Sequence, residues 1–290
     1  MLLAALLAVT PAALTGHAGV QVDDKVFVCG GMGLRNEGRF FSEAWLVDPV
    51  RGSWEPLPEP KLARGMAAAA LLDGSIYLAG GLRWSNGATG AVERFDLVSR
   101  RWSSVAALRT PRSRLGLVTI LGKLYAVSGM RADSGRGSEL NTASIEVYDP
   151  GKNTWQSAGS LNHARHGFAS VVWCGKLYVF GGNDPSSERS AEVWDPKSGV
   201  SSDLPDMPVA RGFPGSILIG NRVLLFGRRS STAHPSAFNL ESRTWKELSS
   251  ADIQINRCVS ALIGGRLFTI GGEAPRPAPI IQSFDAGTWR

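Results

Sequence analysis

Histidine, cysteine and carboxylate side chains supply most metal ligands and catalytic proton carriers. Few of these residues lie close together in this sequence. Its four histidines are spread along the sequence: His17, His163, His166 and His234. Its three cysteines form no CxxC pair: Cys29, Cys174 and Cys258. Zinc sites and disulfide frameworks need closer spacing. The sequence therefore predicts no metal site and no cofactor, and it favours a reducing compartment, the cytoplasm.

Short motifs of enzyme active sites are absent from the sequence. The chain contains no GxSxG, GxxxxGK[ST] or HExxH segment, which would indicate a nucleophile elbow, a phosphate loop or a zinc protease. Glu93, Glu146 and Glu192 recur at one place in a repeated segment. A catalytic carboxylate is expected once, so we predict that these three are structural and pair with polar groups of neighbouring sheets. We predict no catalytic residue and no enzymatic activity.

The composition limits the class of protein. The 290 residues include 34 glycines, and only 19% are charged, which disfavours coiled coils, disorder and long amphipathic helices. The net charge of +6 is dispersed along the chain, unlike the basic patch of a nucleic-acid-binding protein. The longest apolar run, residues 2–9, is too short to span a bilayer. We therefore predict neither nucleic acid nor membrane as a partner.

A segment with strand-like apolar character recurs six times and ends in small residues. The copies are VFVCGG at 26–31, IYLAGG at 76–81, LYAVSG at 124–129, LYVFGG at 177–182, VLLFG at 223–227 and LFTIGG at 267–272. Their last glycines are 45 to 53 residues apart. Repeats of this length indicate propellers or solenoids.

Other residues recur in a fixed order around these runs. An alternating segment ending in Asp or Asn follows each run, and a tryptophan stands six residues later in four units: Trp54, Trp102, Trp155 and Trp245. Arginine precedes the next strand in every unit after the first. Each unit therefore predicts four strands. The units depart from the pattern at Ser128 and Phe226, in places of glycine, and at Ser201, in a place of tryptophan.

This order of Arg, Gly-Gly, Asp and Trp resembles the Kelch repeat over about residues 11–290. It is most similar to the propeller of kelch-like (BTB-Kelch) proteins, although no segment here resembles a BTB or BACK domain. The resemblance implies an all-β fold in which residues 1–290 form a single six-bladed Kelch β-propeller with four antiparallel strands per blade. Stacked blades would close a ring with few exposed edges.

Two uses are open for residues 1–10. Aligning Thr10-Pro11 with Thr110-Pro111 and Gly16 with Gly116 places residues 2–8 where the fourth strand of the sixth blade belongs. The segment would then close the ring and cover an open sheet edge. The alternative is a signal segment, which implies a secreted or periplasmic location, but no Lys or Arg precedes the apolar run.

Basic residues are concentrated in the loops expected on one face of the propeller. The planar guanidinium group of arginine can bind a carboxylate through two hydrogen bonds at once. Trp and Arg are also common anchor residues of protein interfaces. The predicted partner-binding residues are Arg64, Arg83, Trp84, Arg112, Arg114, Arg131, Arg165, Arg211 and Arg257. As an alternative, the arginine that heads each first strand is structural and bonds carbonyls around the central channel.

The leading functional hypothesis is a protein-interaction module that binds an acidic peptide segment on this Arg-rich face. The resemblance implies substrate recognition for a cullin-based ubiquitin ligase, with the cullin-binding part supplied by another chain. An alternative from a different class is an exported enzyme on anionic sugars, similar to Kelch sialic-acid epimerases. A third is an actin-binding Kelch protein, by family analogy alone.

Overall fold

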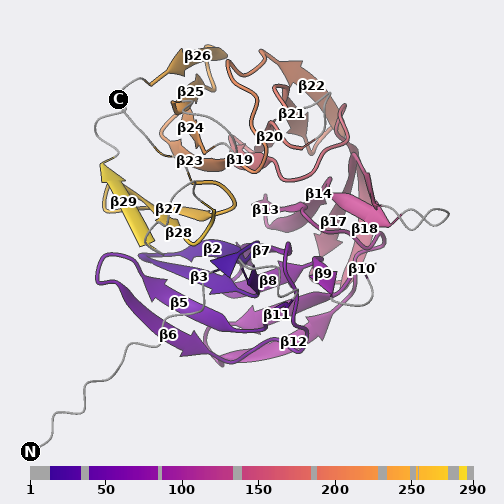
Figure 1. The fold of residues 1–290 in the computed structure, drawn as a ribbon. Helices are drawn as coiled ribbons and strands as arrows, with labels where there is room; N and C mark the ends of the chain where they lie inside the picture. Colours follow the sequence, from indigo (N-terminus) through magenta and orange to yellow (C-terminus); the bar gives the residue numbers. More distant parts are fainter. Residues whose placement is uncertain are drawn as a thin grey trace, which may run out of the picture.

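The computed structural model describes residues 14–33, 39–83, 87–132, 139–183, 188–227, 234–248, 253, 255–273 and 281–285. These residues form antiparallel sheets and no helix. Six main sheets stand around a central axis like the blades of a wheel (Figure 1). We number the blades 1 to 6 in chain order. The six-bladed, all-β propeller predicted from the repeats is confirmed.

Each blade runs outward from the axis in chain order. The innermost strands are β2 (Ala18–Val22), β7 (Ala68–Leu72), β13 (Gly116–Ile120), β19 (Ala169–Trp173), β23 (Gly215–Ile219) and β27 (Val259–Ile263). The second strands are β3 (Lys25–Cys29), β8 (Ser75–Ala79), β14 (Lys123–Val127), β20 (Lys176–Phe180), β24 (Arg222–Phe226) and β28 (Arg266–Ile270). The third strands are β5 (Ala44–Asp48), β11 (Val92–Asp96), β17 (Ser144–Asp149), β21 (Ala191–Asp195), β25 (Ser236–Asn239) and β29 (Ile281–Asp285). The fourth strands are β6 (Ser53–Leu57), β12 (Arg101–Val105), β18 (Thr154–Ser160), β22 (Val200–Leu204) and β26 (Thr244–Glu247).

Short strand pairs lie in the connections between the second and third strands of some blades. β9 (Leu82–Arg83) pairs with β10 (Gly87–Ala88), and β15 (Met130–Ala132) pairs with β16 (Glu139–Asn141). In blade 1 the equivalent connection carries β4 (Met32–Gly33), which pairs with β1 (Leu14–Thr15) from the start of the described chain.

The ring closes by direct contact between its last and first blades. Each innermost strand contacts the next around the axis, in the order β2, β7, β13, β19, β23, β27 and back to β2. At the closing seam the Gln21 side chain donates to the carbonyl of Leu262 at 3.1 Å and accepts from its N–H at 3.0 Å. Apolar side chains of blades 1 and 6 form one cluster across this seam. These contacts close the ring through its inner strands.

Tryptophans of the fourth strands bridge adjacent blades. The indole N–H groups of Trp102, Trp155 and Trp245 donate to carbonyls of the preceding blade at 2.7 to 2.9 Å. Blade 4 has Ser201 in this place, and the residue directly opposite it across the strand pair is Trp194, which is fully buried. The large side chain has therefore moved to the neighbouring strand, which explains how this irregular repeat keeps its packing.

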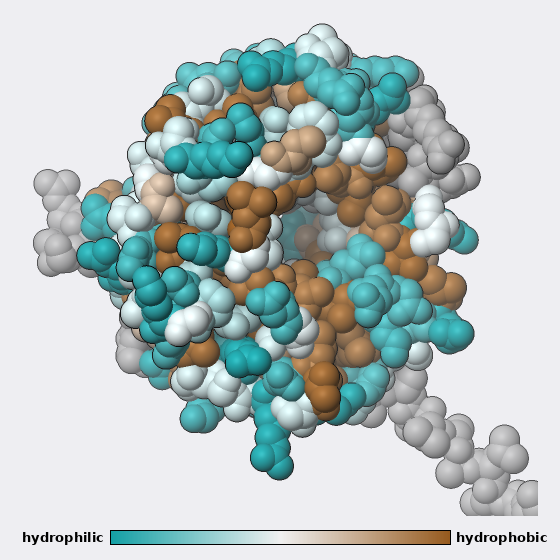
Figure 2. Space-filling model, turned by 180° about the vertical axis from the view of Figure 1, so that it is seen from behind, coloured by the Kyte–Doolittle hydropathy of each residue, from teal (hydrophilic) through white to brown (hydrophobic). Residues whose placement is uncertain are grey.

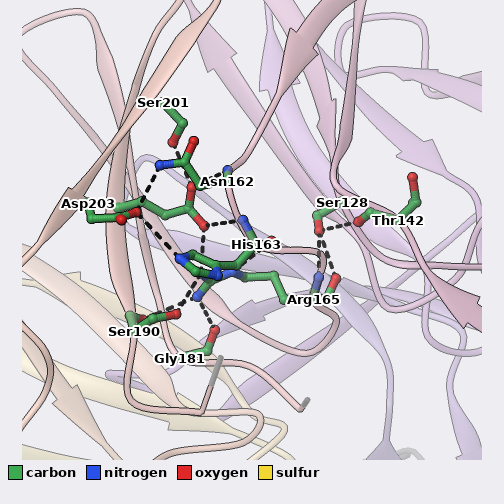
Figure 3. Close-up of polar contacts among 10 residues, drawn as sticks. Ser128, Thr142, Asn162, His163, Arg165, Gly181, Ser190, Ser201 and Asp203 are labelled. Carbon is green, nitrogen blue, oxygen red and sulfur yellow. Dashed lines mark hydrogen bonds and ion pairs between the residues drawn. The ribbon is translucent and has the colours of Figure 1, made fainter. Parts of the chain in front are cut away.

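In blades 1, 2 and 4 the first glycine of the doublet lies against the backbone of the next inter-blade loop. A Cβ added to Gly80 would lie 2.4 Å from the Arg112 carbonyl oxygen. Ser128 occupies this place in blade 3 at φ 52°, and its hydroxyl donates to the Arg165 carbonyl at 2.7 Å (Figure 3). A hydrogen bond thus replaces the close approach that requires glycine elsewhere.

One predicted departure from the repeat was wrong. Phe226 is not at a glycine place, because it is the buried last residue of β24, as Phe180 is of β20. Gly227 follows it and lies against the Ile255 carbonyl, as Gly80 lies against that of Arg112. The shorter VLLFG segment had shifted the alignment by one residue.

The proposed alignment of the N-terminus was also out of register. Gly16 and Arg114 occupy equivalent places, since the N–H of Met66 bonds the Gly16 carbonyl and the N–H of Arg114 bonds the Met66 carbonyl. Gly16 therefore does not match Gly116. Residues 1–13 lie outside the described part of the chain, so their use as a closing strand or a signal segment stays a prediction.

We predict that Gly80→Ala destabilises the fold far more than Gly74→Ala. Both glycines have left-handed φ values, 65° and 68°, but Gly74 has no atom within 4 Å of an added Cβ. The conformational penalty alone costs about 1–2 kcal/mol, whereas Gly80→Ala must also displace backbone. Chemical denaturation of both variants measures the difference, and equal losses of stability would contradict the steric argument.

Candidate functional site

Four of the predicted partner-binding arginines are buried inside the blades. Arg64, Arg112, Arg165 and Arg211 are at most 1% exposed. The Arg165 guanidinium donates to the carbonyls of Gly181 and Ser190 at 2.6 and 3.2 Å and to Glu192 at 2.5 Å (Figure 3). These four side chains cannot contact a partner in this conformation. The structural alternative fits them in part, since they bond backbone carbonyls, but these carbonyls lie inside the blades and not around the central channel.

The repeated glutamates complete this buried network. Glu192 accepts from the backbone N–H of Asn162 at 2.7 Å and from the Ser201 hydroxyl at 2.6 Å, besides Arg165. Glu93 pairs with Arg64 and Glu146 with Arg112 in the same way. Burial lowers the pKa of Arg64 and Arg112, while the glutamate charges raise it. The prediction that these glutamates are structural is confirmed, since each bonds an inter-blade loop to a third strand. Their partners lie in that loop and in the same blade, so the expected pairing with neighbouring sheets was wrong.

Arg257 does not belong to this buried set. In blade 6 the buried place is taken by Ile255, whose carbonyl lies against Gly227 as the Arg112 carbonyl lies against Gly80. Arg257 stands two residues later, at the place of Arg114 in blade 3. The sequence pattern had merged two positions, one facing the blade interior and one facing the channel.

Five consecutive backbone hydrogen bonds run around the channel at this second position and link six residues. The ring residues, one from each blade, are Gly16, Met66, Arg114, Gly167, Phe213 and Arg257. All six have φ between 52° and 63°. Each N–H from Met66 onward donates to the carbonyl of the preceding ring residue, at 2.6 to 3.2 Å. The left-handed backbone turns these groups toward the neighbouring blades and fixes where the ring side chains begin.

A cavity of about 190 Å³ opens beside this ring. We call it the channel mouth. It is lined by Gly16, His17, Met66, Ala67, Arg114, Leu115, Gly167, Phe168, Phe213, Pro214, Arg257 and Cys258. The space-filling view, seen from behind, shows a propeller hollowed at its centre, with hydrophobic and hydrophilic side chains around the hollow (Figure 2). Concave pockets that combine apolar side chains with a few polar or charged groups are typical binding sites.

The two arginines of the channel mouth are held in place and keep donors available. Arg114 donates through Nη1 to Glu139 at 2.7 Å, and Arg257 donates through Nη1 to Glu273 at 2.8 Å. The Arg257 guanidinium also lies over the Phe213 ring, 4.3 Å from its centroid. The side chains are 20% and 18% exposed. Among the described residues neither Nε nor Nη2 of these arginines has a hydrogen-bond acceptor.

His17 is a neutral group in the cavity wall. Its Nε2 donates to the Ile270 carbonyl at 3.0 Å, which leaves Nδ1 as a buried acceptor without a partner among the described residues. Burial lowers the pKa of His17 to about 4, against the smaller raising effect of that backbone bond. Burial also raises the pKa of the neighbouring Cys258 to about 12, so this thiol is a weak nucleophile.

The remaining predicted residues lie on the side hairpins. Arg83 is half-buried on β9 and Arg131 is exposed on β15. Trp84 lies outside the described residues. Sequence reasoning missed Met66, Phe213 and His17, although a usable signal existed: Met66 and Phe213 each stand two residues after a buried arginine, as Arg114 does.

In the described ranges no group of three or more His, Cys, Asp or Glu side chains is placed to hold a metal ion. The same ranges contain no helix long and apolar enough to cross a membrane.

We predict that Arg165→Ala lowers the free energy of unfolding by about 3–5 kcal/mol, because Glu192 is left as a buried charge without its partner. Arg131→Ala, which removes an exposed guanidinium, serves as the matched control and should change stability little. Chemical denaturation measures both. A stable Arg165→Ala protein would contradict the structural role.

We predict that His17 makes the protein less stable in acid. The unfolded chain takes up a proton near pH 6.5 and the folded His17 only near pH 4, so stability falls as the pH drops through this window, by up to about 3 kcal/mol. His17→Gln should flatten the dependence between pH 7 and pH 4.5. Equal pH dependence of the two proteins would contradict burial of a neutral imidazole.

Comparisons with known proteins agree with this architecture. A family model described as the Kelch motif matches residues 13–61, 63–109, 111–162 and 164–208, more than half of the chain. Kelch-like protein 15 of Danio rerio is 26% identical over 255 residues, which cover 78% of this chain and 41% of the relative. Kelch-like protein terF of Aspergillus terreus is 26% identical over 272 residues, with 83% and 59% covered. Kelch-like protein 35 of Mus musculus is 27% identical over 253 residues, with 86% and 42% covered.

The chain thus spans less than two thirds of the length of these relatives. The solved structure of YjhT shares the fold, with a TM-score of 0.78 over 94% of this chain and 95% of that one, at 16% identity. Four matched repeats and six blades around one axis lead to one conclusion: this chain belongs to the Kelch-repeat family.

Proposed function

We propose that this propeller is a protein-interaction module whose channel mouth binds an acidic segment of a partner protein. The observation that carries the proposal is the hydrogen bonding of the Arg114 and Arg257 guanidinium groups. Each is fixed by one glutamate through Nη1, and each keeps Nε and Nη2 without an acceptor among the described residues. A carboxylate that accepts from Nε and Nη2 together forms a two-point contact, the geometry in which arginine binds anions best.

Preorganisation supports this function over a purely structural role for the two arginines. A long side chain that is already immobilised loses less entropy when a ligand binds. The glutamates and the Phe213 ring immobilise these guanidinium groups before any partner arrives. An incoming carboxylate can add to the open edge of each arginine without displacing its glutamate.

Substrate recognition for a cullin-based ubiquitin ligase, in the cytoplasm, is the finer form of this proposal. It rests on the similarity to kelch-like proteins, of which this chain covers only a part. Another polypeptide segment would have to recruit the cullin. In that arrangement the channel mouth would select the substrate through its acidic segment.

A small anionic sugar is the second candidate ligand, in the setting of an exported enzyme. The observation that favours it is the combination of a cavity of about 190 Å³, two arginines and the buried Nδ1 acceptor of His17. Turnover of a sugar acid by the full chain, lost in His17→Gln, would favour this candidate over peptide binding.

We predict that Arg114→Ala and Arg257→Ala each weaken binding of a fluorescent peptide that contains several glutamates by about tenfold or more, since each removes charge-assisted hydrogen bonds. Binding should also weaken as salt rises from about 50 to about 300 mM. Arg101→Ala is the control, because Arg101 is exposed at the start of β12 and makes the same change of charge away from the channel mouth.

Two results would contradict the proposed function. One is equal affinity for the glutamate peptide and its glutamine counterpart. The other is an affinity that does not change with salt or with either arginine substitution. Thermal unfolding of each variant checks that the fold is intact.

A further inference from the structure

The channel mouth has an approximate two-fold pattern that the repeat of blades does not require. Blades 1 to 3 contribute the ring residues Gly16, Met66 and Arg114. Blades 4 to 6 contribute Gly167, Phe213 and Arg257. The order glycine, large apolar residue, arginine therefore occurs twice around the ring. In a six-bladed wheel, positions three blades apart face each other across the axis, so like residues of the two halves are opposite one another.

The packing within the two halves is similar. A Cβ added to Gly16 would lie 2.9 Å from Met66 Cε, and one added to Gly167 would lie 2.5 Å from Phe213 Cε1. Each large apolar side chain therefore lies over the glycine of the preceding blade. Each glycine makes room for its neighbour. Met66 and Phe213 belong to blades three apart, so they lie on opposite sides of the axis.

The arginines of the two halves are also held alike. Arg114 is bound to Glu139 and Arg257 to Glu273, in both cases by Nη1 and in both cases to a glutamate of the same blade. These ties hold each guanidinium on its own side of the mouth. A single carboxylate cannot accept two-point contacts from both arginines while they stay in these positions.

Resting on the proposed function, we propose that the partner segment carries two acidic side chains and lies across the channel mouth. One carboxylate binds Arg114 and the other binds Arg257, each at the open edge formed by Nε and Nη2. The chain between the two acidic residues passes over the apolar surface of Met66 and Phe213. The channel mouth is thus a pair of half-sites and selects two acidic residues at a defined separation.

The Arg257 half-site is the more rigid of the two. Its guanidinium stacks on Phe213, whereas Arg114 also donates from Nη1 to the Met130 sulfur at 3.2 Å and has no aromatic ring beneath it in the described structure. Stacking of this kind stabilises the cation and fixes its plane. We expect Phe213→Leu to weaken the Arg257 contact and to leave the Arg114 contact unchanged.

The experiment uses the full chain and a panel of fluorescent Gly/Ser peptides. Two glutamates are separated by one, two or three residues, and matched peptides replace one or both glutamates by glutamine. Binding is measured for the unchanged protein, Arg114→Gln, Arg257→Gln, the double variant and the control Arg101→Gln. Arg114→Lys and Arg257→Lys serve as second variants that keep the charge and lose the two-point fork.

We expect one separation of glutamates to bind about tenfold or more tighter than either one-glutamate peptide, because two charge-assisted contacts replace one. Each single arginine substitution should lower the affinity of the two-glutamate peptide to the one-glutamate level. A one-glutamate peptide should still bind to either single variant, through the other half-site. Its binding should be lost only in the double variant.

Different failures separate this inference from the function on which it rests. Arginine-dependent binding in which one glutamate is as good as two would overturn the two half-sites and leave the proposed function standing. Loss of one-glutamate binding on a single substitution would do the same. Absence of arginine-dependent binding for every peptide would contradict both, as would an equal effect of Arg101→Gln.

Discussion

Buried guanidinium groups fix the connections into blades 2 to 5, and much of the geometry of the channel mouth depends on them. Arg112 donates to the carbonyls of Ser128 and Ser144 and to Glu146, all in blade 3, while its own carbonyl accepts from Gly81 of blade 2. One residue therefore joins two blades where the chain passes between them. The chain reaches the channel two residues later, at Arg114. The hydrogen bonds of the buried Arg112 thus fix the backbone that positions Arg114, whose side chain is partly exposed at the channel mouth.

The irregular repeats show which parts of this unit are constrained. Ser128 keeps the contact with the next loop by a hydrogen bond, and Trp194 supplies from the third strand the volume that Ser201 lacks in the fourth. Ile255 replaces the buried arginine of blade 6 with an apolar side chain, and no glutamate stands opposite. A buried ion pair and a well-packed apolar residue are of similar stability, so either can occupy this place. What all six blades share is the backbone path.

The fold was predictable from the sequence because its signals are redundant. Six glycine-terminated runs, the recurring tryptophans and the Arg places agree on one unit, so errors of one or two residues at Phe226 and Gly16 did not change the architecture. The site was less predictable. Residue type alone does not separate Arg112 from Arg114, although one is fully buried and the other lines the cavity. The two side chains point to different places because the backbone at Arg114 is left-handed, with φ 52°. The type of a non-glycine residue does not reveal that it has this backbone conformation.

The same distinction changes the electrostatic description of the propeller. A count of arginines in the loops suggests a broadly basic face, but Arg64, Arg112 and Arg165 are neutralised by glutamates within the blades. Charges neutralised and buried in this way add little to the field that a partner meets. The attraction that remains comes from few groups at defined positions, so selectivity should depend on the spacing of acidic groups more than on their number. A ring of six left-handed residues provides such spacing, because its hydrogen bonds hold the starting point of every side chain. Net charge can then change over the rest of the surface without altering which ligand fits.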